Sequence, residues 1–254
     1  MFRPRVIPVL LLNNQTLVKS VRFKNYNYIG DPINAVRIFN DLKADELVFL
    51  DINATKENRL VSLNFVKDVG EEANMPFAVG GGIKTVEDIK QIINAGAEKV
   101  IISSAAAENP DFIKKAFEAF GSSTIAVCID VKRNLFGNTH VWIHAGTKNT
   151  KKNHVEFAKL MEQMGAGELI IQSIENDGVM QGYDIELIKQ ISETVTIPVV
   201  ALGGAATMND LKKAYTQGFA NGLAAGSMFV YHGTMKGVLI NYPDTAEMQF
   251  NEGF

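Results

Sequence analysis

Short apolar runs recur along the chain, and stretches with helical spacing of apolar positions separate them. The apolar runs occupy residues 5–11, 46–51, 77–79, 99–103, 125–130, 168–173, 199–202 and 221–225, and the helical patterns include 32–43, 86–95, 110–120, 155–164, 185–193 and 208–217. The runs are rich in Val, Ile and Leu and lack strict alternation, which is typical of parallel strands covered on both faces. The alternation of strand and helix therefore predicts a parallel α/β fold.

The pattern is duplicated within the chain. One constant offset aligns Gly81 with Gly203 and Glu46 with Glu168, so the repeat unit is half of the chain. An open doubly wound sheet has a similar order of elements, but eight units with an internal halving favour closure into a barrel. We expect a (β/α)8 TIM barrel that forms a single domain over residues 1–254.

Composition narrows the classes of function. The chain has 254 residues and 46% hydrophobic content, enough for one large core. Its net charge of −3 at pH 7 comes without any basic cluster, which argues against nucleic acid and anionic membrane as partners. No run reaches the roughly 18 apolar residues that a membrane span needs, and the first residues lack a signal-peptide pattern. We expect a cytoplasmic protein.

Neither the cysteine nor the histidines indicate a metal site or another cofactor. Cys128 is the only cysteine and lies in an apolar run, so we expect it in the core rather than as a nucleophile. The histidines lack the usual spacing of zinc ligands, and we expect them on the surface or in loops. They are His140, His144, His154 and His232.

Two long segments follow the first and the fifth apolar run, at equivalent places in the two halves. They span residues 12–31 and 131–153, and we expect both to be loops. Loops at the carboxyl ends of barrel strands usually carry lids and substrate contacts.

Small residues follow four of the apolar runs in a repeated arrangement. They are Gly81, Gly82, Ser103 and Ser104 in the first half and Gly203, Gly204, Gly226 and Ser227 in the second. Glycine allows backbone amides to approach an anion closely, and a short helix after each pair would add its free N-terminal amides. One such loop could simply be a tight turn, but two in register favour phosphate binding. We expect a substrate with two distant phosphates.

Asp130 is the main candidate for acid–base chemistry. It ends the fifth run, where barrel enzymes place catalytic groups, although it could instead cap a loop. Leu11 occupies the equivalent end of the first run, so the chain offers one carboxylate where a symmetric pair would supply an acid and a base. Further candidates are Asp51, Asp177 and Asp184, of which Asp177 also fits an ordinary turn.

Charged residues begin four of the runs: Arg5, Glu46, Lys99 and Glu168. Counting by twos along each strand predicts that they point into the barrel, at the end opposite the small-residue loops. Two positive and two negative side chains could neutralise one another there, and buried charges require such pairing. A ring of this kind would form a plug or a gate, whereas the alternative is four separately solvated strand starts.

These residues together resemble the HisF family, the cyclase subunit of imidazole glycerol phosphate synthase. The resemblance extends to about Val230 and rests on Lys19 and several segments. The segments are Arg5-Val-Ile-Pro, Gly30-Asp-Pro, Asp45-Glu-Leu-Val-Phe-Leu-Asp-Ile, Val79-Gly-Gly-Gly-Ile, Gly96-Ala-Glu-Lys-Val, Glu108-Asn-Pro, Ile129-Asp, Lys148-Asn-Thr, Gly165-Ala-Gly-Glu, Asp177-Gly and Gly182-Tyr-Asp.

The resemblance implies a partner and a set of roles. In the family, a glutaminase docks on the barrel floor and supplies ammonia, and the salt-bridge gate of the family corresponds to the four charged strand starts. Of the two catalytic aspartates, one corresponds to Asp130 and the other to Leu11, which cannot transfer a proton. Lys19 corresponds to a substrate contact on the first mobile loop. The implied partner is a HisH-like glutaminase, and the implied substrate is a phosphorylated small molecule.

The chain departs from the family at its chemistry-bearing end. Ser103, Gln172, Val179 and Leu202 replace the usual residues there, and the segment 238–243 lacks the usual last amphipathic helix. The chain thus resembles the HisF-like branch associated with amidation of surface-polysaccharide sugars, in which ammonia passes to a separate sugar amidotransferase. The alternatives are an authentic cyclase, a lyase of histidine biosynthesis, and a catalytically silent scaffold that only channels ammonia.

Overall fold

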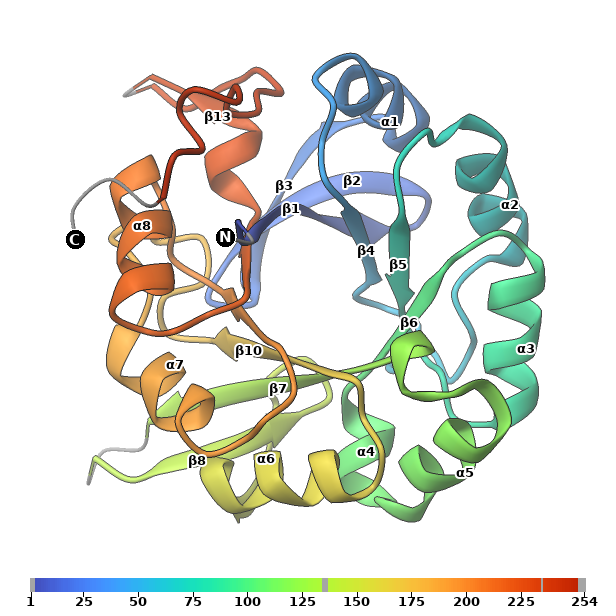
Figure 1. Cartoon of the computed structure of the whole chain (residues 1–254). Coiled ribbons are helices and arrows are strands. Elements are labelled where there is room, and N and C mark those ends of the chain that lie inside the picture. Colours follow the sequence, from blue (N-terminus) through green and yellow to red (C-terminus); the bar gives the residue numbers. More distant parts are fainter. Residues whose placement is uncertain (1–2, 134–136, 234, 251–254) are drawn as a thin grey trace.

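The computed structural model describes residues 3–133, 137–233 and 235–250. Its centre is a closed barrel of parallel strands, seen along its axis in Figure 1. The barrel strands, in their order around it, are β1 (Arg5–Asn13), β4 (Leu47–Asp51), β5 (Phe77–Gly80), β6 (Lys99–Ile102), β7 (Ile125–Arg133), β10 (Glu168–Ser173), β11 (Val199–Leu202) and β12 (Gly222–Ala225). β12 pairs with β1, beginning at Arg5 and Gly222, and this pairing closes the ring. The predicted (β/α)8 barrel is confirmed.

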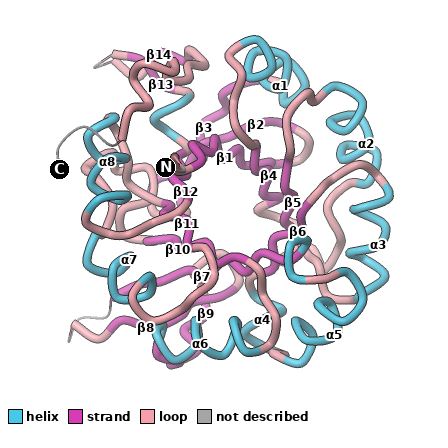
Figure 2. Tube along the Cα trace, in the orientation of Figure 1, coloured by secondary structure: helices cyan, strands magenta, loops and turns pink. Residues whose placement is uncertain are grey.

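Helices surround the strands on the outside, as Figure 2 shows. They are α1 (Pro32–Asp41), α2 (Leu63–Glu72), α3 (Val86–Asn94), α4 (Ser104–Glu108), α5 (Asp111–Phe120), α6 (His154–Gln163), α7 (Ile185–Ser192) and α8 (Met208–Thr216). The prediction did not include α2, although Ser62 caps it and Phe65, Val66 and Val69 form its buried face. No helix in the described part of the chain is long and apolar enough to cross a bilayer.

The internal repeat is visible in how two helices begin. Thr85 caps α3 and accepts a hydrogen bond from the Asp88 amide, while the Asp88 carboxylate accepts one from the Thr85 amide. Thr207 and Asp210 form the same reciprocal arrangement at the start of α8. A capping box satisfies amides that the first helical turn leaves without partners.

The two long segments expected as loops are antiparallel extensions of barrel strands. β1 continues past the barrel and pairs with β2 (Thr16–Val21), which pairs with β3 (Lys24–Gly30). β7 pairs in the same way with β8 (Thr139–Ile143), followed by β9 (Lys148–Asn153). The prediction of loops was wrong here because these strands are stabilised by pairing beyond the barrel rather than by a continuous apolar run. Residues 134–136 lie outside the described part.

The eighth barrel strand is not followed by an α-helix. A 3-10 turn, η2 (Ser227–Phe229), leads into the hairpin β13 (Tyr231–His232) and β14 (Gly237–Val238). Residues 239–250 contain no helix and run between α8 and α1, at the upper left of Figure 1. We call residues 239–250 the strap. The expected absence of a last amphipathic helix is thus confirmed for the described residues.

Two apolar clusters stabilise the barrel. The larger lies between strands and helices and contains the strand positions that point outward, such as Val6 and Leu10. The smaller fills the lumen with side chains that point inward, such as Ile7 and Val9. Successive residues of a strand point to opposite faces, so each strand contributes to both clusters.

Candidate functional site

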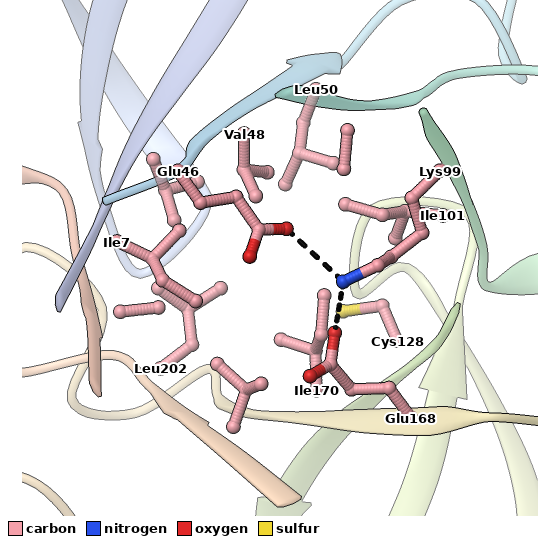
Figure 3. Close-up of a pocket in the computed structure, with 14 residues that line it drawn as sticks. Ile7, Glu46, Val48, Leu50, Lys99, Ile101, Cys128, Glu168, Ile170 and Leu202 are labelled. Carbon is pink, nitrogen blue, oxygen red and sulfur yellow. Dashed lines mark hydrogen bonds and ion pairs between the residues drawn. The ribbon is translucent and has the colours of Figure 1, made fainter. Parts of the chain in front are cut away.

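The four charged strand starts form a closed ring at the N-terminal end of the barrel. Lys99 Nζ lies 3.1 Å from Glu46 Oε1 and 2.8 Å from Glu168 Oε2, as Figure 3 shows. Arg5 pairs with the same two glutamates from the other side. Each cation therefore contacts both anions, and we call this arrangement the floor ring. The side chains of Glu46 and Glu168 are only 7% and 8% exposed, so pairing replaces the water they lose.

The charges of the floor ring stabilise one another. Burial by itself would lower the pKa of Arg5, but the carboxylates of Glu168 and Glu46 outweigh this and raise it. Arg5 is therefore charged at any physiological pH, and the ring holds two positive and two negative groups.

Above the floor ring, the lumen is apolar and almost filled. Figure 3 shows Ile7, Val48, Ile101 and Ile170 around its axis. The enclosed space is about 10 Å³, close to the smallest that holds one water-sized molecule. Cys128 is buried there as expected, and burial raises the pKa of its thiol well above the ordinary value.

A wide cavity opens at the carboxyl ends of the strands, at the opposite end from the floor ring. Its volume is about 740 Å³, within the range typical of small-molecule sites. The main residues predicted for catalysis or phosphate binding line it: Lys19, Gly81, Gly82, Ser103, Ser104, Asp130, Asp177, Gly203, Gly204, Gly226 and Ser227. We call it the upper cavity.

The loops around the upper cavity combine tight turns with the starts of short helices. A Cβ atom on Gly82 would lie 1.8 Å from the carbonyl oxygen of Arg59, so this turn requires glycine whether or not it binds an anion. One short helix begins at Ser104, directly after Ser103, and another begins at Ser227, directly after Gly226. After the glycine pairs, however, helices begin only at Val86 and Met208 and are capped by threonine. A helix thus follows each pair as expected, although a connecting segment separates the glycine pairs from α3 and α8.

Asp130 lies at the base of the upper cavity in a mostly apolar setting. Burial raises its pKa to about 7, although hydrogen bonds from Cys128 and Ser103 act in the opposite direction. Ser103 Oγ lies 3.3 Å from Asp130 Oδ2, and Cys128 Sγ lies 3.6 Å from Oδ1. Such a carboxyl can hold or release a proton near neutral pH. Leu11 lines the same cavity, but its side chain has no group that could donate or accept a proton.

Lys19 reaches the upper cavity from β2. Its side chain is buried, and Nζ donates a hydrogen bond to the carbonyl oxygen of Val9 at 2.5 Å. Burial lowers its pKa to about 8, while the nearby charge of Asp177 opposes this. A Cβ atom on Gly226 would lie 2.5 Å from Nζ. The glycine at this position therefore makes room for the lysine, a role that sequence reasoning missed.

Asp177 does more than close a turn. It accepts hydrogen bonds from Ser20 Oγ at 2.8 Å, from Gln172 Nε2 at 3.2 Å and from the Phe23 amide at 3.3 Å. Burial raises the pKa of Asp177 above its usual value, although these hydrogen-bond donors and the nearby charge of Lys19 oppose the rise. The carboxylate thereby connects the β2–β3 hairpin to the end of β10 and stands beside Lys19.

The remaining aspartate candidates have structural partners. Asp51 lines the upper cavity and pairs with Arg59 at 2.5 Å. Asp184 caps α7 by accepting a hydrogen bond from the Leu187 amide at 3.1 Å, and it does not line the upper cavity. Asp184 as a chemical candidate was therefore wrong, because a carboxylate one position before a helix satisfies that helix.

The structure also places Gln172 and two of the histidines. Gln172 is buried, and its Oε1 has no hydrogen-bond partner among the described residues. His144, expected in a loop, lines the upper cavity and contacts Glu108 at 2.9 Å. His154, expected on the surface or in a loop, is instead buried at the start of α6, against Gln190. Among the residues described, no group of three or more His, Cys, Asp or Glu side chains could hold a metal ion.

Comparison with known proteins shows which family the chain belongs to. The family described as histidine biosynthesis protein matches residues 5–236. A provisionally named imidazole glycerol phosphate synthase subunit hisF3 of Vibrio vulnificus (strain YJ016) is 44% identical over 248 residues, 97% of this chain and 95% of the relative. The chain belongs to the HisF family. The predicted resemblance is thus confirmed.

Two other HisF relatives cover the chain almost as fully. A provisionally named imidazole glycerol phosphate synthase subunit HisF of Leptospira borgpetersenii is 44% identical over 250 residues, 98% of each chain. The imidazole glycerol phosphate synthase subunit HisF of Alkaliphilus metalliredigens (strain QYMF) is 42% identical over 232 residues, 91% of this chain and 92% of the relative.

The residues expected to depart from the family pattern lie mainly where the lumen meets the upper cavity. Leu11, Ser103, Gln172 and Leu202 all line the cavity, whereas Val179 does not. Leu11 lies opposite Leu50 across the β1–β4 pairing, and both are half-buried. The lumen therefore ends in a leucine-rich rim, with Asp130 and Gln172 as the buried polar groups beside it.

Proposed function

We propose that this HisF-family barrel is the ammonia-conducting subunit of a glutamine amidotransferase complex. A HisH-like glutaminase would dock at the floor ring, and ammonia would cross the lumen to the upper cavity. It would then serve amidation of a surface-polysaccharide sugar by a separate sugar amidotransferase. The observation that carries this proposal is the contrast between the complete floor ring and the leucine at position 11.

The lumen supports passage of ammonia rather than of ammonium. Moving an ion into an apolar interior costs far more than moving a neutral molecule, because the ion loses its hydration. Above the floor ring, the described side chains that line the lumen are apolar, such as Val48 and Ile170, apart from the buried thiol of Cys128. Its small free volume fits a molecule of the size of ammonia and requires side-chain motion for anything larger.

The upper cavity supports a phosphorylated ligand but a reduced acid–base set. Asp130, with a pKa of about 7, is a suitable proton donor or acceptor. Leu11 cannot take the complementary role, and loss of one general acid or base typically costs about 10²–10⁴ in rate. The HisF reaction that the family name implies would therefore be slow on this barrel, or absent from it.

An authentic cyclase is the second candidate, because Asp130 and Lys19 line the same cavity as both sets of phosphate loops. In this case the barrel would form imidazole glycerol phosphate and the aminoimidazole carboxamide ribotide. Asp130 would be the acid–base residue, and Lys19, with a pKa of about 8, would contact the substrate. The third candidate, a catalytically silent channel, differs from the first in predicting no turnover on the barrel itself.

A cyclase assay separates these candidates. The purified barrel is supplied with the substrate expected for a HisF cyclase, a phosphoribulosyl-type bisphosphate, and with ammonium chloride. The Asp130→Asn variant is the control. We expect no turnover above the control, with substrate binding retained in calorimetry. Turnover that Asp130→Asn abolishes would instead establish the cyclase. If Asp130 is then the base, the rate should rise through pH about 7, because the carboxylate forms above its pKa.

A second assay tests the partner. The barrel is mixed with the HisH-type glutaminase encoded in the same genome, and complex formation is followed by light scattering. We expect a one-to-one complex and a glutaminase rate that rises on binding. Absence of a complex at micromolar concentrations would contradict the proposed function.

A further inference from the structure

The strap stands where a helix would follow the eighth barrel strand, and its aromatic side chains pack against the barrel and its helices. The ring of Tyr242 lies 6.4 Å from that of Phe39 on α1 and 5.7 Å from that of Phe229 after β12. Phe250 packs on Tyr215 of α8 at 6.0 Å. Tyr242 is only 9% exposed. The strap is thus held between α8 and α1, close to the outside of β1.

The hydroxyl of Tyr242 connects two segments that carry members of the floor ring. It donates a hydrogen bond to the carbonyl oxygen of Val6 at 2.9 Å and accepts one from the amide of Asp45 at 3.0 Å. Val6 directly follows Arg5, and Asp45 directly precedes Glu46. One buried hydroxyl therefore bonds both backbones at the positions next to these two ring residues.

Backbone pairing does not hold these two segments together. The parallel pairing of β1 with β4 begins only at Val9 and Val48, above the floor ring. Below that level, the Val6 carbonyl and the Asp45 amide require partners from elsewhere, because buried backbone groups are almost always paired. Tyr242 supplies both partners. Burial raises the pKa of Tyr242, so its hydroxyl keeps the proton that it donates.

A second layer of contacts strengthens this connection. Asp45 Oδ2 accepts a hydrogen bond from the Val6 amide at 2.9 Å, and Arg3 pairs with the same carboxylate at 2.6 Å. Arg3 Nη1 also lies 3.3 Å from Met248 Sδ on the strap. The strap thus contacts the base of β1 and β4 at two points, through Tyr242 and through Met248.

We infer that Tyr242 is a positioning residue for the floor ring, and that its hydroxyl sets the spacing between the segments bearing Arg5 and Glu46. Without this bond the two segments separate, the carboxylate of Glu46 moves away from Lys99, and the ring opens. The role of the floor ring in ammonia passage rests on the proposed function. The contribution of Tyr242 to the geometry of the ring does not depend on that function.

The test compares Tyr242→Phe with Tyr183→Phe. Tyr183 is the matched control because its buried hydroxyl donates to the carbonyl oxygen of Ala224 at 2.9 Å and bonds neither Val6 nor Asp45. The readout is the rate of reductive methylation of Lys99, measured by peptide mass spectrometry with exposed Lys67 as internal reference. We expect Tyr242→Phe to raise the Lys99 rate about fivefold, the equivalent of one hydrogen bond of about 1 kcal/mol.

Two results would overturn the inference. One is a Lys99 rate that is unchanged in a folded Tyr242→Phe protein, and the other is an equal increase in Tyr183→Phe, which would indicate general loosening. Hydrogen exchange of the unaltered protein is a check that needs no variant: the Asp45 amide should be protected, and rapid exchange would refute the bond. Neither measurement requires glutaminase or ammonia, so their failure would leave the proposed function standing.

Discussion

Leu11 on β1 and Asp130 on β7 both line the upper cavity, but only one of the two side chains can exchange a proton. Burial lets Asp130 keep a proton up to about pH 7, although the hydrogen bonds from Cys128 and Ser103 oppose this. Leu11 faces the same cavity next to Leu50. Of these two side chains, only the carboxyl of Asp130 can exchange a proton with a ligand.

We predict that Leu11→Asp alone will not create full cyclase activity. Gln172 and Leu202, which we expect to be further departures from the family, line the same cavity, so the new acid would lack its usual surroundings. A carboxylate beside Leu50 also costs about 1–3 kcal/mol of stability if nothing pairs with it. The measurement is cyclase turnover with ammonium chloride, and Leu11→Asn is the uncharged control. Robust turnover by Leu11→Asp but not by Leu11→Asn would refute this prediction.

At the scale of elements, equivalent helices and strands of the two halves are built alike, but the second half ends without a helix. Both α3 and α8 begin with a capping box. Both β1 and β7 continue into antiparallel hairpins that border the upper cavity. After β12, by contrast, the strap replaces a helix and carries Tyr242 to the barrel floor.

The capping box of α8 offers a test of how much one helix start contributes. Thr207→Ala removes the side-chain acceptor for the Asp210 amide and the donor to the Asp210 carboxylate. We expect the free energy of unfolding to fall by about 1 kcal/mol, as for other N-cap losses. Urea denaturation measures it. Thr207→Ser keeps a hydroxyl and should lose much less, so an equal loss in both variants would contradict the capping role.

At the scale of the whole molecule, the floor ring joins strands from both halves. Arg5, Glu46 and Lys99 belong to the first half and Glu168 to the second. The apolar lumen then connects this charged end to the polar upper cavity. Charge, apolar barrier and ligand space are thus arranged in sequence along one axis.

Removing one cation should show that the floor ring acts as a unit. Lys99→Met leaves Glu46 and Glu168 with Arg5 as their remaining ring partner, and unpairing a buried charge costs roughly 3–5 kcal/mol. Since Lys99 is 18% exposed, we expect a loss near the lower end, about 3 kcal/mol, in urea denaturation. Lys67→Met is the control, because Lys67 pairs with Glu71 at 3.7 Å on the open surface. A comparable loss in the control would argue against a special contribution from the ring.

The sequence by itself determined the order of the eight barrel strands, the half-barrel repeat and the layer of four charges. These features depend on periodicity and on the alternation of strand faces, which are local and therefore readable along the chain. The residues of the upper cavity were predictable for the same reason, because the carboxyl ends of all barrel strands meet on one side.

Only the tertiary structure decided which distant groups become partners. The bond from Lys19 to the Val9 carbonyl, the space that Gly226 leaves for it and the contacts of Asp177 all join segments whose distance depends on packing. The same is true of Tyr242, which bonds Val6 across most of the chain. Burial, not sequence neighbourhood, also sets the pKa of Asp130 near 7, because desolvation depends on everything that surrounds the carboxyl.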